Sequence, residues 1–269
     1  MNHLFRELAP VSDAAWAEIE AEAARSLRNF LAGRKVVDLT GPLGWNESAS
    51  ALGRVDALPH PVTDGVEASV RLVQPLIELR TRFTMARSEL DSIDRGNNAP
   101  DLGAVIEAAH RAALAEDHAI FGGYPAGGIA GISTQTPHDR IAIDDDYEEF
   151  PRAVASAVAL LRAAGVDGPF GVALGPRCYT SVIETTQRGG YPVLEQLRLI
   201  TGGPLVWAPA VDGSIVLSLR GGDFELVSGE DFSIGYSHHD ADTVDLFLEE
   251  SMTFRAHAPE AAVVLAHPS

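Results

Sequence analysis

The stretch VEASVRLVQPLIELRTRFTM, residues 66–85, decides the fold, because its side chains alternate in character over twenty positions. Apolar residues occupy every second position from Val66 to Leu72. The same alternation resumes after Pro75 and continues to Met85. A period of two predicts extended strand with one apolar and one polar face.

A hairpin-turn signal, Asp64-Gly65, directly precedes this stretch, so residues 52–58 are the expected partner strand. Twenty extended residues would reach roughly 65 Å, whereas a compact domain of this length is about 45–50 Å across. Two interpretations stay open. Either Pro75 ends one strand and begins another in an ordinary sheet, or the ribbon leaves its own subunit and a neighbouring chain covers its apolar face.

Length and composition narrow the class of protein. The 269 residues are near the upper limit for one core, which favours two lobes. No apolar run is long enough to span a membrane, and the first ten residues lack the apolar core of a signal peptide. The single Cys178 excludes an intrachain disulfide and favours a reducing, cytosolic compartment. A net charge of −18 argues against a nucleic-acid coat.

Helices and strands are expected in separate runs, which is typical of an α+β fold. The first helix is expected to begin at the N-cap candidates Ser12 and Asp13 and to stop at Gly33. Further helices are predicted at residues 101–121, 150–164, 176–186 and 193–200. Strands are predicted at residues 35–39, 205–207, 214–219, 224–227, 233–236, 244–248, 252–257 and 262–265.

Several polar clusters are better explained as turns than as sites. Adjacent histidines on a strand point to opposite faces, so a polar turn explains the metal-like group His238, His239, Asp240 and Asp242 better than a chelate does. The run 144–146 lacks the glycine and terminal glutamate of a calcium loop. No Lys-Ser/Thr pair follows the glycines of residues 122–128, as a phosphate loop requires. The candidate nucleophiles lack local catalytic signatures; they are Ser181, Ser218 and Cys178.

Five separated segments, in order and spacing, resemble the encapsulin shell protein family. They are LAPVSDAAWAEIE (8–20), LAGRKVVDLTGPLGW (31–45), ELDSIDRG (89–96), AEDHAIFGG (115–123) and RGGDFELVSGEDFSIGY (220–236). The resemblance implies the fold of tailed-phage major capsid proteins. Its implied parts are an N-terminal helix with the start of a peripheral domain (1–51), an extended loop (52–85), the peripheral domain with a spine helix (86–135), an axial domain (136–220) and return strands (221–269).

The resemblance also implies a function without catalysis. Identical subunits of such proteins, about sixty in the smallest icosahedral shell, enclose a cargo enzyme in a cytoplasmic nanocompartment. The cargo is typically a dye-decolorising peroxidase or a ferritin-like protein, which suggests roles in oxidative stress or iron storage. Two alternatives stay open: a phage or prophage capsid protein that packages nucleic acid, and a hydrolytic enzyme of unknown specificity.

Members of this family bind a C-terminal peptide of the cargo on the inner wall. Transferred to this sequence, the peptide groove would use Leu27, Phe30, Leu31, Arg34, Val37 and Asp38 on one side and Phe232, Ile234 and Tyr236 on the other. Apolar anchors would bury leucine or isoleucine side chains of the peptide, and Arg34 and Asp38 would fix its backbone or charge. Alternatively, these apolar residues only join the helix to the sheet.

Two further expectations follow from the resemblance. The loop Gln187, Arg188, Gly189, Gly190, Tyr191 and Pro192 is similar to the loop that rims the five-fold pore, where five copies of Arg188 would favour anions; a plain surface turn is the alternative. Some members bind a flavin on an aromatic residue beside the extended loop. Arg87 and Ser88 occupy that region here, so no flavin, other cofactor or metal is expected.

Overall fold

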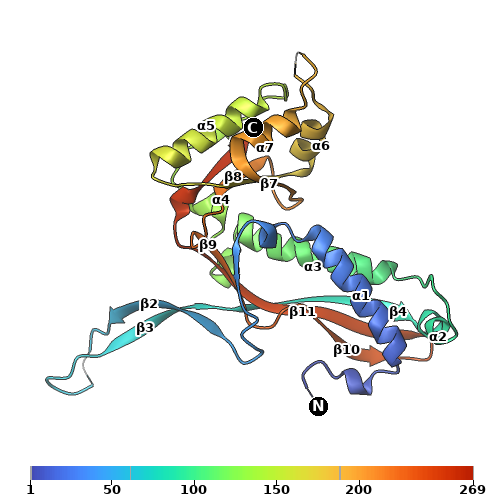
Figure 1. Ribbon diagram of the computed structural model, residues 1–269. Coiled ribbons are helices and arrows are strands. Elements are labelled where there is room, and N and C mark those ends of the chain that lie inside the picture. The colour runs from blue at the N-terminus through green and yellow to red at the C-terminus, as the bar shows by residue number, and fades with distance from the viewer. Residues whose placement is uncertain (1, 61, 188, 269) are drawn as a thin grey trace.

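The computed structural model describes residues 2–60, 62–187 and 189–268, which form two packed parts and a projecting ribbon (Figure 1). The α-helices are α1 (Asp13–Phe30), α2 (Arg87–Asp94), α3 (Gly103–Phe121), α4 (Ile132–Gln135), α5 (Phe150–Ala163), α6 (Pro176–Glu184) and α7 (Val193–Thr201). Short 3-10 turns are η1 (Arg6–Leu8), η2 (Gly33–Lys35), η3 (Pro125–Gly127) and η4 (Pro259–Ala261). None of the described helices is long and apolar enough to cross a membrane.

In the described parts of the chain, the strands form three separate sheets. They are β1 (Asp38–Thr40), β2 (Ala49–Ala57), β3 (Ser69–Pro75), β4 (Ile77–Ala86), β5 (Ile141–Ala142), β6 (Phe170–Leu174), β7 (Gly202–Trp207), β8 (Ser214–Ser218), β9 (Phe224–Ser228), β10 (Ser233–His239), β11 (Thr243–Ala256) and β12 (Ala262–Ala266). One sheet has the order β1-β9-β11-β10 with β4 also paired to β11, a second has the order β5-β12-β8-β6-β7, and β2 pairs only with β3.

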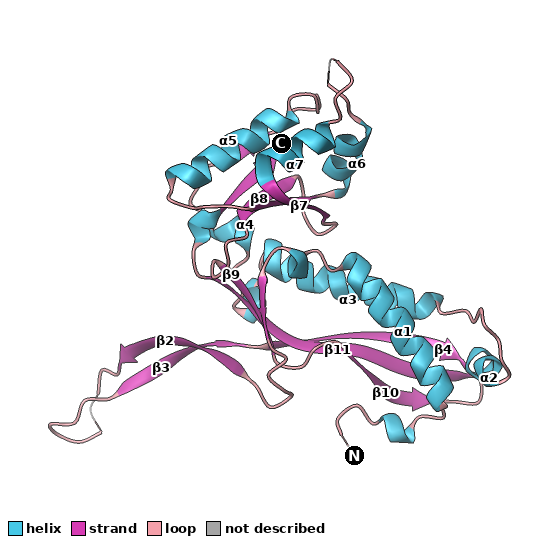
Figure 2. Cartoon of the chain, viewed as in Figure 1, coloured by secondary structure: helices cyan, strands magenta, loops and turns pink. Residues whose placement is uncertain are grey.

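Helices α1 and α3 lie side by side along the sheet that contains β4, β11 and β10 (Figure 2). The predicted N-cap is confirmed, because the Ser12 hydroxyl accepts a hydrogen bond from Ala15 N–H. Buried residues at helical spacing, including Trp16, Ile19 and Leu27, face a core shared with α3 and β4. Burial of each such side chain contributes about 1.5–3 kcal/mol. This core fixes the position of the end of α1.

The alternating stretch that opened the sequence becomes two strands that serve different sheets. Strand β3 pairs with β2 in the projecting ribbon, whereas β4 pairs antiparallel with β11 in the main sheet, and only Leu76 separates β3 from β4. A turn forms at Asp64 and Gly65, with Gly65 at φ 79°, but β3 begins at Ser69 rather than at Val66, so the connection to β2 is longer than the predicted tight hairpin. One strand therefore ends at Pro75 and another begins just after it, as the first interpretation predicts. The half before Pro75 leaves the body of the subunit, as the second interpretation predicts (Figure 1).

Several predicted boundaries are wrong. Residues 244–248 and 252–257 belong to one strand, β11, because the polar residues Glu249–Ser251 that suggested a break are buried and paired. Helix α1 ends at Phe30 rather than at Gly33, which lies in η2. The strand predicted at 35–39 begins only at Asp38, where it pairs with β9. Strand β10 continues to His239, so the predicted polar turn narrows to residues 240–242.

Candidate functional site

The nine residues of the expected peptide groove lie in two neighbouring places rather than on one open surface. Leu27, Leu31 and Ile234 are buried in the core between α1 and the main sheet, and Phe30, Phe232 and Tyr236 lie half-buried at its margin. Val37 packs against the other core, and Asp38 is exposed. The structure therefore brings the helix side and the strand side together, but it leaves only the half-buried residues and the exposed Asp38 accessible to a peptide.

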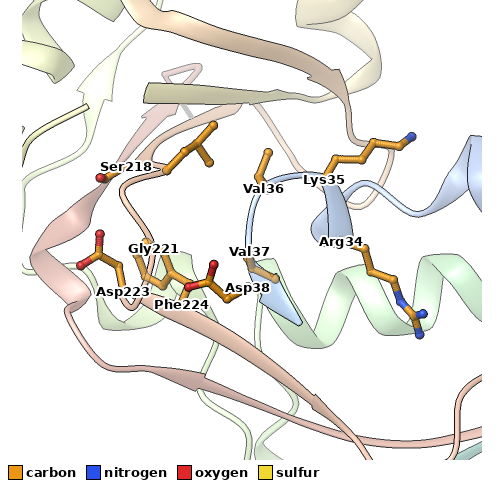
Figure 3. Close-up of a pocket in the computed structure, with 10 residues that line it drawn as sticks. Arg34, Lys35, Val36, Val37, Asp38, Ser218, Gly221, Asp223 and Phe224 are labelled. Carbon is orange, nitrogen blue, oxygen red and sulfur yellow. The ribbon is translucent and has the colours of Figure 1, made fainter. Parts of the chain in front are cut away.

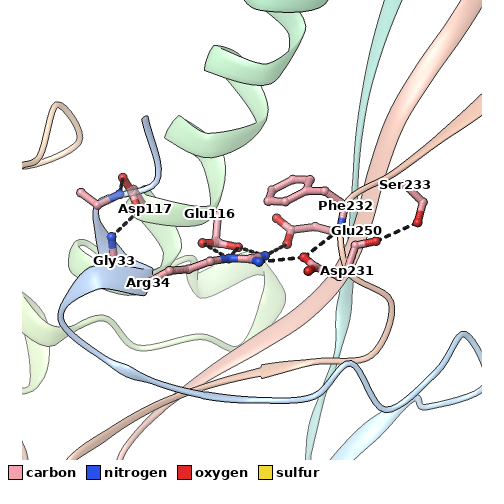
Figure 4. Close-up of polar contacts among 9 residues, drawn as sticks. Gly33, Arg34, Glu116, Asp117, Asp231, Phe232, Ser233 and Glu250 are labelled. Carbon is pink, nitrogen blue, oxygen red and sulfur yellow. Dashed lines mark hydrogen bonds and ion pairs between the residues drawn. The ribbon is translucent and has the colours of Figure 1, made fainter. Parts of the chain in front are cut away.

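Arg34 lies at the centre of a group of carboxylates (Figure 4). Its Nε donates to Glu116 Oε2 at 2.8 Å, Nη1 donates to Asp231 Oδ1 at 2.7 Å, and Nη2 reaches Glu250 Oε2 at 3.1 Å. The guanidinium also lies 5.0 Å from the ring centre of Phe232. Because partners within the chain occupy these donors, Arg34 positions the wall that carries Phe232. The expectation that it binds a peptide charge directly is not supported by this geometry.

The carboxylates outnumber the cation that binds them. Glu116 and Glu250 are both fully buried, and burial, together with the neighbouring Glu116, raises the pKa of Glu250 well above its ordinary value. Burial alone would lower the pKa of Arg34, but the hydrogen bond and charge of Glu116 outweigh it and raise the pKa. One guanidinium thus faces two buried carboxyl groups, and the raised pKa of Glu250 favours its protonated form.

Asp117 holds the corner between α1 and η2 in place. Its carboxylate oxygens accept hydrogen bonds from the backbone N–H groups of Ala32 at 2.9 Å and Gly33 at 2.7 Å. Burial raises the pKa of Asp117 to about 7, although these two hydrogen bonds oppose the shift. Sequence reasoning missed Glu116, Asp117 and Glu250; adjacent acidic residues on an otherwise apolar helix face were the available signal for the first two.

A small pocket lies beside Asp38, between η2 and the connection from β8 to β9 (Figure 3). Its volume is about 200 Å³, and its walls come from residues 34–38 and from the connection that leads into β9. Asp38 Oδ2 accepts a hydrogen bond from Gly222 N–H at 2.5 Å. Figure 3 shows the Arg34 side chain pointing away from Asp38 and Gly221. Arg34 and Asp38, which were both expected in the groove, therefore do not face the same part of a bound peptide.

The expected pore loop forms a tight turn between α6 and α7. Gln187 N–H donates to Tyr191 C=O at 2.9 Å, and Gly190 N–H donates back to Gln187 C=O at 2.9 Å. Gly189 and Gly190 adopt positive φ, and Tyr191 is exposed. Arg188 lies outside the described residues. Glycine suits this turn because two successive left-handed positions strain other residues.

The remaining polar candidates form hydrogen bonds within the chain. Among the described residues, no group of three or more His, Cys, Asp or Glu side chains is arranged to hold a metal ion. His239 instead forms a hydrogen bond through Nδ1 with the Tyr236 hydroxyl, at 2.5 Å. Arg87 begins α2, a helix that the sequence pattern did not predict, and its guanidinium donates to Asp240 C=O at 3.3 Å.

Comparison with known proteins decides the family. The sequence model of a family described as "Encapsulating protein for peroxidase" matches residues 1–253. The chain belongs to the encapsulin shell protein family. It is 53% identical to a type 1 encapsulin shell protein of Rhodospirillum rubrum, over 98% of this chain and 96% of that protein. It is 48% identical to a type 1 encapsulin shell protein of Mycolicibacterium paratuberculosis, over 98% of this chain and 99% of that protein.

Solved structures confirm the capsid fold of this encapsulin chain. A virus-like particle from Pyrococcus furiosus aligns with a TM-score of 0.68 at 17% identity, covering 93% of this chain and 98% of that one. The capsid of Myoviridae phage XM1 aligns with a TM-score of 0.55 at 10% identity, covering 87% and 90%. The chain is therefore a structural component of a multi-subunit, capsid-like particle and not an enzyme.

Proposed function

We propose that about sixty copies of this chain close into an icosahedral shell that encloses a cargo enzyme in the cytoplasm and binds the C-terminal peptide of that cargo. The β2–β3 ribbon is the observation that carries the proposal. It projects from the body (Figure 1), and three of its valines are exposed: the exposed fraction is 60% at Val55, 46% at Val70 and 51% at Val73. An apolar surface of this kind is typical of an interface.

The mass of the purified particle tests this proposal. One chain has a mass of 28.6 kDa, so a sixty-subunit shell would measure about 1.7 MDa. We expect native mass spectrometry or light scattering to find that species, without co-purified nucleic acid. A folded species that stays near the mass of one chain would contradict closure. A large particle filled with nucleic acid would instead favour a genome-packaging capsid.

The cargo is proposed to dock between the end of α1 and β10. Phe232 and Tyr236 are half-buried on β10 or directly before it, and both pack at the edge of the core that contains Leu27 and Leu31. A peptide leucine placed here would extend an existing apolar core, which favours binding by about 25 cal/mol per Å². The matching family is described as encapsulating a peroxidase, which supports a peroxidase as the first cargo to test, ahead of a ferritin-like protein.

Cargo loading distinguishes this groove from a purely structural contact. Leu31 is only 7% exposed, so a charge there would disrupt the core and would not test binding. Phe232→Ser changes an accessible position, and Leu160→Ser on α5 is a matched control at an exposed site of the other part. We expect Phe232→Ser shells to assemble but to retain at least tenfold less co-expressed peroxidase than parent or control shells. An unchanged cargo-to-shell ratio would contradict the groove.

The loop at 187–192 is proposed to rim a pore at the five-fold axis, with Arg188 supplying a positive ring. Its position at an exposed tip, its two glycines and the exposed Tyr191 support this role. Permeation into intact shells tests it. Compared with parent shells, Arg188→Glu shells should admit a small dianionic dye more slowly and a neutral dye at the same rate. If the dianionic dye enters parent and Arg188→Glu shells at the same rate, the pore is rejected.

A further inference from the structure

Residues 2–8, here called the N-terminal strap, lie against the outer edge of β10. The backbone N–H of Tyr236 donates a hydrogen bond to Leu4 C=O at 2.8 Å, and the Leu4 side chain is buried. Strand β10 is the last strand in its sheet and pairs with β11 on its other side. The strap therefore covers part of an edge that would otherwise present unpaired backbone groups.

Two anchors hold the strap, and the first is the side chain of Arg6. Arg6 forms an ion pair with Glu20 of α1 at 2.5 Å, and its guanidinium lies 4.2 Å from the ring centre of Trp16. This anchor ties η1 to α1.

The other anchor is His3, which has several charged groups around it. Its ring stacks on Trp45 with a centroid distance of 3.8 Å and an angle of 5°. Nε2 lies 2.8 Å from Glu230 Oε2, between β9 and β10, and 3.4 Å from Glu249 Oε1 on β11. From β4, Arg80 Nε donates to Glu249 Oε2 at 2.7 Å. Glu249 is almost fully buried and Glu230 is largely so.

Burial raises the pKa of Glu249, and the positive charges of Arg80 and His3 oppose that shift. With both carboxyl groups ionised, the charges in this cluster balance when His3 is protonated. Two carboxylates face one permanent cation, Arg80, and an imidazolium at His3 supplies the second positive charge. When the imidazole is neutral, one carboxylate charge is left without a counter-charge in a poorly solvated position. Histidine is the side chain that ordinarily changes charge between pH 5 and 8. The anchor at His3 is therefore strongest on the acid side of neutrality.

Between the two anchors, the backbone of the strap is strained. Phe5 has φ 51° and ψ 23°, and among the described residues it is the one non-glycine residue with positive φ. A side chain with a Cβ disfavours this left-handed conformation, which persists only where the surroundings enforce it. The Phe5 ring is itself exposed, so the contacts on either side must hold the strained turn.

We propose that the N-terminal strap is a pH-responsive cover on the edge of β10, closed by protonated His3 and released when His3 loses its proton. Release frees residues 2–5 and relaxes the turn at Phe5, while the Arg6–Glu20 pair keeps η1 in place. The exposed edge includes Tyr236. Any effect on cargo binding rests on the proposed function, but the release itself does not.

Hydrogen–deuterium exchange on the assembled, cargo-free particle tests the strap. After correction for the intrinsic pH dependence of exchange, we expect peptides that cover residues 2–8 and 233–237 to exchange at least tenfold faster at pH 8 than at pH 6. His3→Gln cannot be protonated and should give the fast rate at both pH values. His118→Gln, an exposed histidine on α3, is the matched control and should behave as the parent.

Equal protection of the parent at pH 6 and pH 8 would overturn the proposal, as would slow exchange in His3→Gln at pH 6. If His3→Gln fails to assemble, the pH dependence of the parent still decides, together with the part of the tryptophan emission that Trp45→Phe removes, measured across the same range. An imidazolium stacked on the indole should quench the emission at acid pH, and emission that does not change would again overturn it. Because no cargo is present, these outcomes are independent of the peptide groove.

Discussion

At the scale of single residues, two adjacent acidic side chains of α3 have different roles. Glu116 binds Arg34 and so ties α3 to η2, whereas Asp117 accepts two backbone hydrogen bonds at the corner where α1 ends. Both are buried, and a buried carboxylate is tolerated only where charge or donors surround it. The groove wall therefore depends on residues that no peptide would touch.

The raised pKa of Asp117 predicts a pH dependence of stability. Because this pKa rises from 3.8 to about 7 on folding, the folded chain retains a proton that the unfolded chain releases between about pH 4 and 7. Stability therefore falls as pH rises through this window, by at most about 1.4 kcal/mol per pH unit. The melting temperature of the parent relative to Asp117→Asn should fall by up to roughly 3–6 °C per pH unit, and stay constant above pH 7.

The control for this measurement is Glu107→Gln, which removes an exposed carboxylate from the same helix. Because Glu107 forms only an exposed ion pair with Arg111, the melting temperature of Glu107→Gln relative to the parent should vary much less with pH between 4 and 7. A difference between parent and Asp117→Asn that is constant, or that grows with pH, would show that Asp117 is ionised in the folded chain throughout.

At the scale of elements, the ribbon differs from its sequence pattern in one respect. The alternation predicted one apolar face, but Val73 lies opposite Ala51 and shares a face with Arg71 and Val55, whereas Val70 lies on the other face. A bulge at Gly53, with φ 68°, sets this register. Exposed valines on both faces suit a ribbon that lies between two neighbouring surfaces.

Charge placed on either face of the ribbon should block assembly without unfolding the subunit. Val70→Asp and Val73→Asp alter exposed positions on opposite faces, so the cost falls on the interface rather than on the core. We expect light scattering to show a loss of at least tenfold in the shell fraction for each variant. Ser69→Asp, which adds the same charge on the Val73 face, should retain most of it. Full assembly of Val70→Asp would restrict the interface to the other face.

The sequence pattern was sufficient to predict strands and helices wherever one apolar face repeats, as in α1 and β4. It failed where buried polar residues interrupt that repeat. Glu249 and Glu250 suggested a loop, and only the positions of Arg80 and Arg34 from distant segments explain why they lie inside β11. The same contacts explain Arg34. Its charge suggested a ligand for the peptide, but no local pattern reveals that three carboxylates already bind it.

At the scale of the whole molecule, charge opposes the assembly that the apolar ribbon favours. Each chain has a formal net charge of −18, so about sixty copies would carry roughly 1,080 negative charges. This formal count treats every carboxyl group as ionised, and burial raises the pKa values of Asp117 and Glu250, so lowering the pH reduces the negative charge. Salt shortens the range of this repulsion: the screening length is about 8 Å at 0.15 M salt and about 30 Å at 0.01 M, so the repulsion is stronger at low salt.

Assembly should therefore weaken when high pH and low salt are combined. We expect mass photometry to show a smaller fraction of shells at pH 9 and 0.01 M NaCl than at pH 9 and 0.15 M, and a smaller effect of salt at pH 6.5. Restoring 0.15 M salt should restore the shells, because repulsion and not unfolding causes the loss. A particle mass that does not change across all four conditions would show that contacts between subunits outweigh the repulsion throughout.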